Sequence, residues 1–123
     1  MSFIDEQFLS YEYSLIMKEL GFSDPCFGWY NKEKNLLIYY LYNVDQMTDD
    51  MILAPQYKQF FKWVEKKYDI ISYFTFEHNS WVYNILGYDF VIISELQKNI
   101  EIAELECLKK IFKIIQKDGK KIS

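Results

Sequence analysis

The sequence contains no arginine, and all fourteen of its basic residues are lysines. Arginine is the side chain that most often grips phosphate or guanine with two parallel hydrogen bonds. Its absence, together with a formal net charge of −4, argues against sequence-specific recognition of nucleic acid. We interpret the lysines near the C-terminus as surface charges that complement the dipole of a last helix. They face a single acid, Asp118, and are Lys109, Lys110, Lys113, Lys117, Lys120 and Lys121.

Glycine, proline and cysteine are scarce as well, with four, two and two residues respectively. Low-complexity linkers are therefore excluded, and the cysteines are too few for a disulfide framework. We expect Cys26 and Cys107 to be free, buried thiols. No apolar run approaches the ~18–20 residues of a membrane span, and the N-terminal residues are acidic where a signal peptide is basic. We therefore expect a cytoplasmic protein without a membrane segment.

Recognisable catalytic and metal-binding patterns are also missing from the sequence. No Ser-His-Asp or Cys-His arrangement can be assembled around the single histidine, His78, which lies in an expected turn. The Asp45–Asp50 loop gathers carboxylates, but its spacing matches no EF-hand, so we interpret it as solvated. We expect no catalytic site, no metal and no cofactor. An enzyme that uses Cys26, His78 or this loop remains an open alternative.

Apolar side chains recur at helical spacing in three parts of the chain, which predicts helices over residues 11–20, 55–68 and 100–117. Ser10 and Asn99 are suitable N-caps for the first and last of these helices. Gly21 is a suitable left-handed C-cap, which would let Phe22 fold back onto Met17. Pro55 is expected at the first position of the second helix, where a missing N–H is harmless.

Runs of aromatic and β-branched residues predict strands that form two hairpins and one further short strand. The expected ranges are 26–30, 36–43, 70–77, 81–86 and 90–93. We therefore predict one α+β domain over residues 1–123, with three helices and an antiparallel sheet of four to five strands in the order α-β-β-α-β-β-(β)-α. The helix–hairpin unit seen in residues 11–43 is expected to recur in residues 56–86.

Aromatic side chains are the one abundant class, with 11 Tyr, 10 Phe and 3 Trp. These exceed what a small core can hide, and the Leu36–Asn43 strand is apolar on both faces, so we expect some of them to reach the surface. Tyrosine and tryptophan are enriched at binding hot spots and also stack on bases. The alternative is that they complete sheet edges and helix seams. The candidate binding residues are Tyr39, Tyr40, Tyr42, Tyr73, Trp81 and Tyr83.

Three stretches of the sequence resemble a group of short proteins without an assigned activity, encoded in Bacteroidota genomes and in many of their phages and prophages. The stretches are Ser10-Tyr11-Glu12 with Glu19-Leu20-Gly21-Phe22 and Pro25-Cys26, then Phe61-Lys62-Trp63-Val64-Glu65-Lys66-Lys67-Tyr68, then Ala103-Glu104-Leu105-Glu106-Cys107-Leu108-Lys109-Lys110. In that group a Tyr-Glu-Glu precedes the last stretch, whereas Ile100-Glu101-Ile102 stands here. The resemblance implies a small mobile-element protein that acts on a host component.

Two functional hypotheses follow from these observations. The first is a non-enzymatic interaction protein of phage or prophage origin, which binds a host protein, such as part of a defence system, through exposed aromatics in the host cytoplasm. Self-association into a homodimer belongs to the same class. The alternative is a protein that sequesters a small molecule, such as a nucleotide signal, at the seam of an oligomer. Stacking aromatics and lysines would supply the contacts there.

Overall fold

The computed structural model describes residues 8–42 and 48–122, and it describes the backbone alone for residues 39–42 and 118–122. It divides into two compact units, unit 1 with residues 1–60 and unit 2 with residues 61–123. Three helices and two three-stranded antiparallel sheets form the described part, which confirms the predicted α+β class. The strands that were expected in one sheet are shared between the two units.

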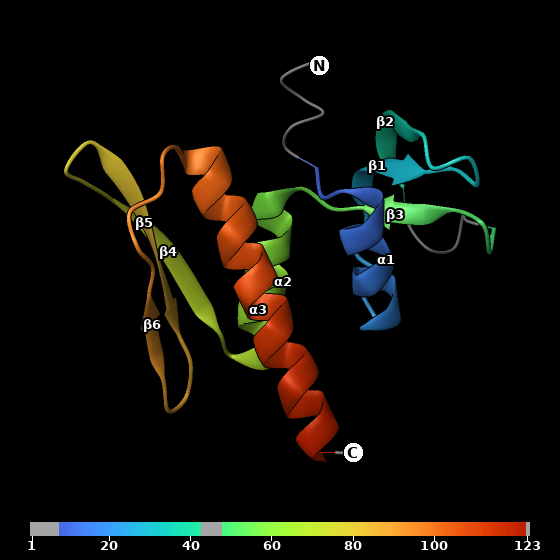
Figure 1. Cartoon of the computed structure of the whole chain (residues 1–123). Coiled ribbons are helices and arrows are strands. Elements are labelled where there is room, and N and C mark those ends of the chain that lie inside the picture. The colour runs from blue at the N-terminus through green and yellow to red at the C-terminus, as the bar shows by residue number, and fades with distance from the viewer. Residues whose placement is uncertain (1–7, 43–47, 123) are drawn as a thin grey trace. The chain divides into compact units, whose positions relative to one another are not determined.

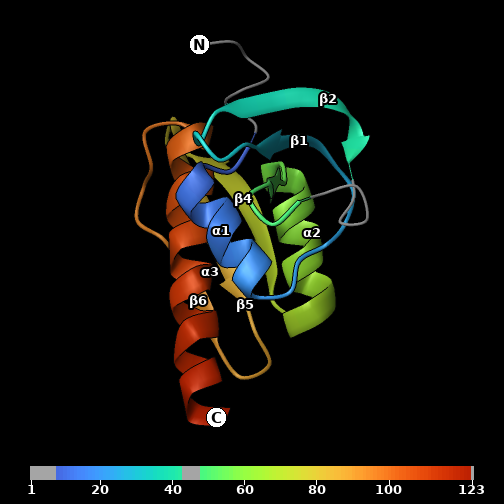
Figure 2. The ribbon, with the colours of Figure 1, turned by 90° about the vertical axis from the view of Figure 1, so that its right-hand side faces the viewer.

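Unit 1 contains one helix and a sheet with the strand order β2-β1-β3 (Figure 1). Its elements are α1 (Tyr11–Glu19), β1 (Cys26–Tyr30), β2 (Leu36–Tyr42) and β3 (Ile52–Ala54). The β1–β2 hairpin lies where the sequence predicts it, and its strands run side by side (Figure 2). Strand β3 was not predicted, because its three residues contain one β-branched side chain and no aromatic, whereas the equally short β6 is a β-branched run.

The two ends of α1 follow the predicted capping pattern. The Ser10 hydroxyl accepts a hydrogen bond from the Tyr13 N–H at 3.3 Å. At the other end Gly21 has a φ of 96°, and the Phe22 N–H donates to the Met17 carbonyl at 2.9 Å. This is the Schellman arrangement, in which the backbone folds back on the last turn. It brings Phe22 into the interior, where its side chain is buried.

A buried cluster of unit 1 lies on one face of its sheet. Phe8, Tyr30, Ile52 and Ala54 are buried together there. The Tyr30 hydroxyl donates to the Leu9 carbonyl at 2.7 Å, which satisfies the polar end of a buried ring. The partly buried side chains that pack against this cluster are Tyr11, Leu15 and Leu36.

Helix α2 (Tyr57–Tyr68) begins in unit 1 and ends in unit 2. It starts at Tyr57 and not at the predicted Pro55, because the Phe60 N–H closes the first turn onto the Gln56 carbonyl. Pro55 is instead buried just before the helix, and its carbonyl accepts from the Leu9 N–H at 2.9 Å.

Unit 2 has the strand order β4-β5-β6, followed by a long helix. Its strands are β4 (Ile71–Glu77), β5 (Ser80–Leu86) and β6 (Val91–Ile93), and its helix is α3 (Ile100–Ile122). The predicted N-cap of α3 is confirmed, because the Asn99 side-chain oxygen accepts from the Ile102 N–H at 2.9 Å. The helix–hairpin order occurs in both units, but the central strand differs: it is β1, the first of its hairpin, in unit 1 and β5, the second, in unit 2.

The β4–β5 hairpin is closed by a two-residue turn, His78-Asn79, in which both residues have positive φ, 51° and 59°. This is the backbone of a type I′ turn, whose twist matches that of the strands it joins. Seven consecutive pairs follow without a register shift, from Glu77 opposite Ser80 to Ile71 opposite Leu86. The turn therefore determines which side chains share each face of the sheet.

Helices α2 and α3 lie on one side of this sheet (Figure 1). Phe61 of α2 meets Phe74 of β4 edge to face, with ring centroids 5.5 Å apart. Helix α3 contacts β5, and its Cys107 lies within hydrogen-bond reach of Ser72. The residues of β4 with even numbers therefore point toward the helices.

Substitutions at Asn79 test the turn. Alanine lacks the side chain that makes a left-handed backbone tolerable for asparagine, so Asn79→Ala should lower the free energy of unfolding by about 1 kcal/mol. Asn79→Gly should leave it unchanged or raise it, because glycine adopts positive φ freely. Urea unfolding measures both variants. Equal stability of the two would contradict a left-handed residue at this position.

Candidate functional site

The structure separates the candidate binding residues that were predicted from the sequence. Trp81 and Tyr83 lie on the helix-covered face of β5, because they are opposite Phe76 and Phe74 of β4. Burial, together with nearby Cys107 and Glu106, raises the pKa of the Tyr83 hydroxyl. Tyr73 lies on the other face and is 45% exposed. The side chains of the remaining candidates, Tyr39, Tyr40 and Tyr42, lie outside the part of the chain that the structure describes.

The face of the β4–β5–β6 sheet that carries Tyr73 is here called the open face. Residues that pair across an antiparallel ladder point to the same side. Two rows therefore cross this face, Ile71–Leu86–Val91 and Tyr73–Asn84–Ile93. Four of these side chains are well exposed, with Ile71 at 42%, Tyr73 at 45%, Val91 at 65% and Ile93 at 67%.

Asn84, in the middle of its row, is buried, but the exposure of the four apolar or aromatic side chains on the outer strands runs against the usual pattern of an antiparallel sheet. Such a sheet normally buries one apolar face and presents polar side chains on the other. Here the helix-covered face buries Ile85 completely, and yet the open face is also mainly apolar. A contiguous apolar patch on a protein surface marks an interaction site more often than scattered single side chains do.

The charges in the segment that forms the open face are all of one sign. No lysine or arginine lies between residues 69 and 97, while that segment holds Asp69, Glu77, Asp89 and Glu95. Glu77 belongs to the open face itself, because its carboxylate accepts from the hydroxyl of Thr75, two residues before it on β4, at 3.1 Å. All four acids are exposed. The open face is thus an apolar surface with an acidic rim.

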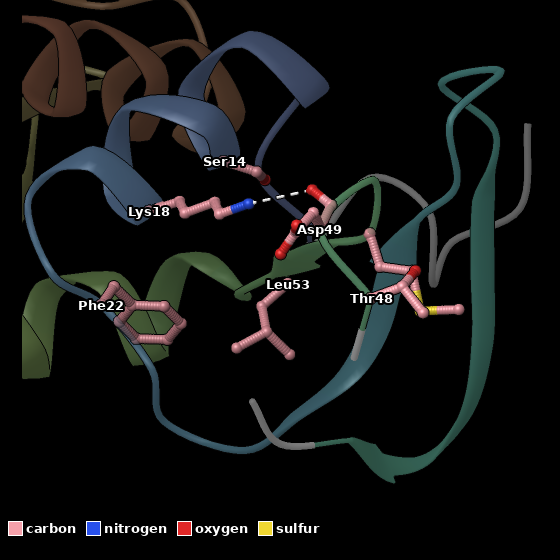
Figure 3. Close-up of a pocket in the computed structure, with 7 residues that line it drawn as sticks. Ser14, Lys18, Phe22, Thr48, Asp49 and Leu53 are labelled. Carbon is pink, nitrogen blue, oxygen red and sulfur yellow. Dashed lines mark hydrogen bonds between the residues drawn. The ribbon is translucent and has the colours of Figure 1, made fainter. Parts of the chain in front are cut away.

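A second candidate site is a cavity of about 210 Å³ in unit 1, between α1 and β3 (Figure 3). The Lys18 ammonium reaches across its mouth and donates to the Asp49 carbonyl at 3.2 Å. Apolar and polar side chains share the wall. The lining residues are Ser14, Lys18, Phe22, Thr48, Asp49, Met51 and Leu53.

Size and charge limit what this cavity accepts. Ligand pockets usually measure roughly 300–1,000 Å³, so it is small for a nucleotide. Lys18 and Asp49 of the lining carry one charge of each sign, and Asp50, the next residue along the chain, adds a second carboxylate. A hydrogen bond from the Thr48 hydroxyl lowers the pKa of Asp50, so this carboxylate is ionised at neutral pH. Phosphate would therefore be repelled as well as attracted.

The residues of the enzyme alternative are found in very different surroundings. Burial raises the pKa of the Cys26 thiol to about 12, so this sulfur is a thiol and not a nucleophilic thiolate at neutral pH. His78 lies in the exposed turn of unit 2. Asp45 lies outside the described residues, which hold no group of three or more His, Cys, Asp or Glu side chains suited to a metal ion.

No family model matches the chain, and comparisons with curated proteins and with solved structures find no match. Within residues 8–42 and 48–122, no helix is both long enough and apolar enough to cross a membrane. The function therefore has to be argued from the geometry of these sites.

Sequence reasoning missed most of the open face. The two-sided apolar pattern was recognised in Leu36–Asn43, and the same signal is present in β4, where Ile71 and Tyr73 alternate with Phe74 and Phe76. Val91 and Ile93 gave no such signal, because a three-residue strand does not reveal which of its sides is covered.

The state of the two cysteines is testable. Burial raises the pKa of Cys107 as well as that of Cys26, from 9.0 to about 12 in both cases. At about pH 8 both thiols of the folded protein should resist a disulfide reagent, whereas the protein unfolded in guanidinium should react fully.

The same shifts predict a loss of stability at high pH. The unfolded chain loses these protons near pH 9.0 and the folded one only near 12, so the thiols' contribution to stability should fall as the pH rises between these values. In the labelling test at about pH 8, fast reaction of either thiol in the folded protein would contradict the burial of that thiol and favour a reactive cysteine.

Proposed function

We propose that this protein is a non-enzymatic binding protein that recognises another protein through the open face of its β4–β5–β6 sheet. The observation that carries the proposal is the pair of apolar rows on that face, with Val91 and Ile93 two-thirds exposed. A sheet that is covered by α2 and α3 on one side gains nothing in stability from apolar side chains in water on the other. A partner that covers the open face would remove this surface from water.

The acidic rim indicates the chemistry of the partner. Glu77, Asp89 and Glu95 would repel the same residues of a second copy laid face to face, whereas they would attract lysine or arginine. The partner expected here is therefore a different protein, apolar at the centre of its contact surface and basic at its edge. Tyr73 is suited to the centre of such an interface, since tyrosine offers a large rigid ring and a hydroxyl.

The resemblance to short phage and prophage proteins supports a host protein as the source of this partner. A component of a host defence system is one such host protein. The resemblance carries no residue-level information, so the choice of the open face depends only on the exposure and charge described above.

The alternative, sequestration of a small molecule, has one supporting observation, the cavity beside Lys18. Its volume and its two neighbouring carboxylates suit a small neutral or amphipathic molecule better than a nucleotide. Thermal-shift screening tests it, because a ligand that binds the folded state raises the melting temperature.

The test of the main proposal compares two exposed aliphatic side chains. Tagged protein is incubated with bacterial lysate, and bound proteins are quantified by mass spectrometry. Ile93→Ser removes a side chain of the open face, whereas Ile102→Ser removes one that is 38% exposed on α3, the helix on the opposite side of the sheet. A true partner should bind Ile93→Ser about tenfold less, and Ile102→Ser as well as it binds the native protein.

The charge of the rim gives a second criterion for the same partner. Binding should weaken as salt is raised, because screening reduces the attraction between the acidic rim and a basic surface. Capture that is equal for Ile93→Ser and for the native protein, or that is indifferent to salt, would contradict the proposal.

A further inference from the structure

Strand β4 forms one edge of the unit 2 sheet, and its neighbour β5 is paired on both sides. In an antiparallel ladder, a residue directs both its N–H and its C=O either toward the neighbouring strand or away from it. The hydrogen bonds between β5 and residues 94–97 therefore show which N–H and C=O groups of β4 point away from β5.

Trp81 exchanges two hydrogen bonds with Gln97, at 2.8 and 2.6 Å, and the Tyr83 carbonyl accepts from the Ser94 N–H at 3.0 Å. Trp81 and Tyr83 thus direct their backbone away from β4. Their partners across the ladder are Phe76 and Phe74, and Ser72 follows by alternation. The N–H and C=O groups of Ser72, Phe74 and Phe76 therefore point outward from the sheet edge.

This edge has none of the features that usually protect an edge strand. Natural edges carry lysine, proline or a bulge, or are very short. Strand β4 has seven residues, pairs with β5 without a register shift, and contains neither lysine nor proline. Its side chains are also accessible, with Phe76 60% exposed. The other long edge strand, β2, is opposite a register irregularity between Cys26 and Gly28.

We propose that β4 pairs with β4 of a second copy of this chain, antiparallel and about a two-fold axis at Phe74. In this register the outward groups meet, with Ser72 opposite Phe76 and Phe74 opposite Phe74, which gives about six hydrogen bonds between the copies. The only charged residue of β4, Glu77, comes opposite Ile71, so like charges do not face each other. The strand is therefore complementary to itself, as a two-fold interface requires.

The pairing would join two sheets into one of six strands in the order β6-β5-β4-β4-β5-β6. The open faces of both copies would then form one continuous surface, because strands that pair edge to edge share their faces. The dimer leaves the open face free for the partner, and it does not depend on the proposed function.

A single strand pair buries little surface, and α2, which contacts β4 through Phe61, carries exposed lysines that repel their copies. We therefore expect weak association, with a Kd on the order of 100 μM.

Sedimentation and residue-specific hydrogen exchange by NMR test the pairing on the native protein. The sedimenting mass should rise from 15.0 kDa at low concentration toward twice that value near 1 mM. Over the same range, the amides of Ser72, Phe74 and Phe76 should exchange at least about tenfold more slowly. Those of Tyr73 and Thr75, which already bond to β5, should be protected throughout.

A matched pair of variants isolates the edge amide. Ser72→Pro removes an outward N–H that β5 does not use, so the strand should persist by circular dichroism while the protein stays monomeric. Ser72→Ala keeps that N–H and removes the same hydroxyl, so it should dimerise like the native protein. A protein that is monomeric at all concentrations would overturn the proposal. So would a dimer in which the three outward amides stay unprotected, or a folded Ser72→Pro variant that dimerises normally.

Discussion

The register of the β4–β5 hairpin is the constraint on which the rest of unit 2 depends. His78 and Asn79 form a two-residue turn with left-handed backbone, and this turn leaves only one way to align the strands that it joins. A slip by a single residue would turn one of the two strands over relative to the other. Either Ile85 would then leave the interior, or Ile71 and Tyr73 would turn toward the helices. This alignment determines which face of the sheet α2 and α3 cover and which face stays open. It also determines which amides of β4 point outward.

Much of the local structure could be predicted from the sequence because its causes are local. Ser10 and Asn99 cap helices through contacts three residues away, and Gly21 ends α1 for lack of a Cβ. The hairpins were predicted because their turns interrupt clear runs of aromatic and β-branched residues. Strand β3 was missed because only its pairing with β1, more than twenty residues earlier, makes it a strand. The division into two sheets depends on such distant pairing and is not visible in periodicity.

The candidate site could be predicted only as a class of residue. Counting aromatics showed that some had to reach the surface, and Tyr73 does. Whether another aromatic residue is exposed depends on which face of its strand carries the side chain. The pairing places Trp81 and Tyr83 on the face that the helices cover. The exposed aliphatics Val91 and Ile93 matter as much as the aromatics, and composition gave no reason to single them out. The cavity in unit 1 was also invisible in sequence, because Lys18 and Asp49 are thirty-one residues apart.

The open face and the β4 edge belong to the same sheet but offer different kinds of contact. The face offers apolar area with an acidic rim, and the edge offers backbone hydrogen bonds that are indifferent to side-chain identity. The proposed function depends on the claim that Ile71, Val91 and Ile93 of the open face are exposed to water. Methyl NMR with a soluble nitroxide measures this directly. Their methyl signals should be strongly broadened, whereas those of the buried Ile85, Ile111 and Ile115 should be unaffected. Equal protection of Val91, Ile93 and Ile85 would contradict the account.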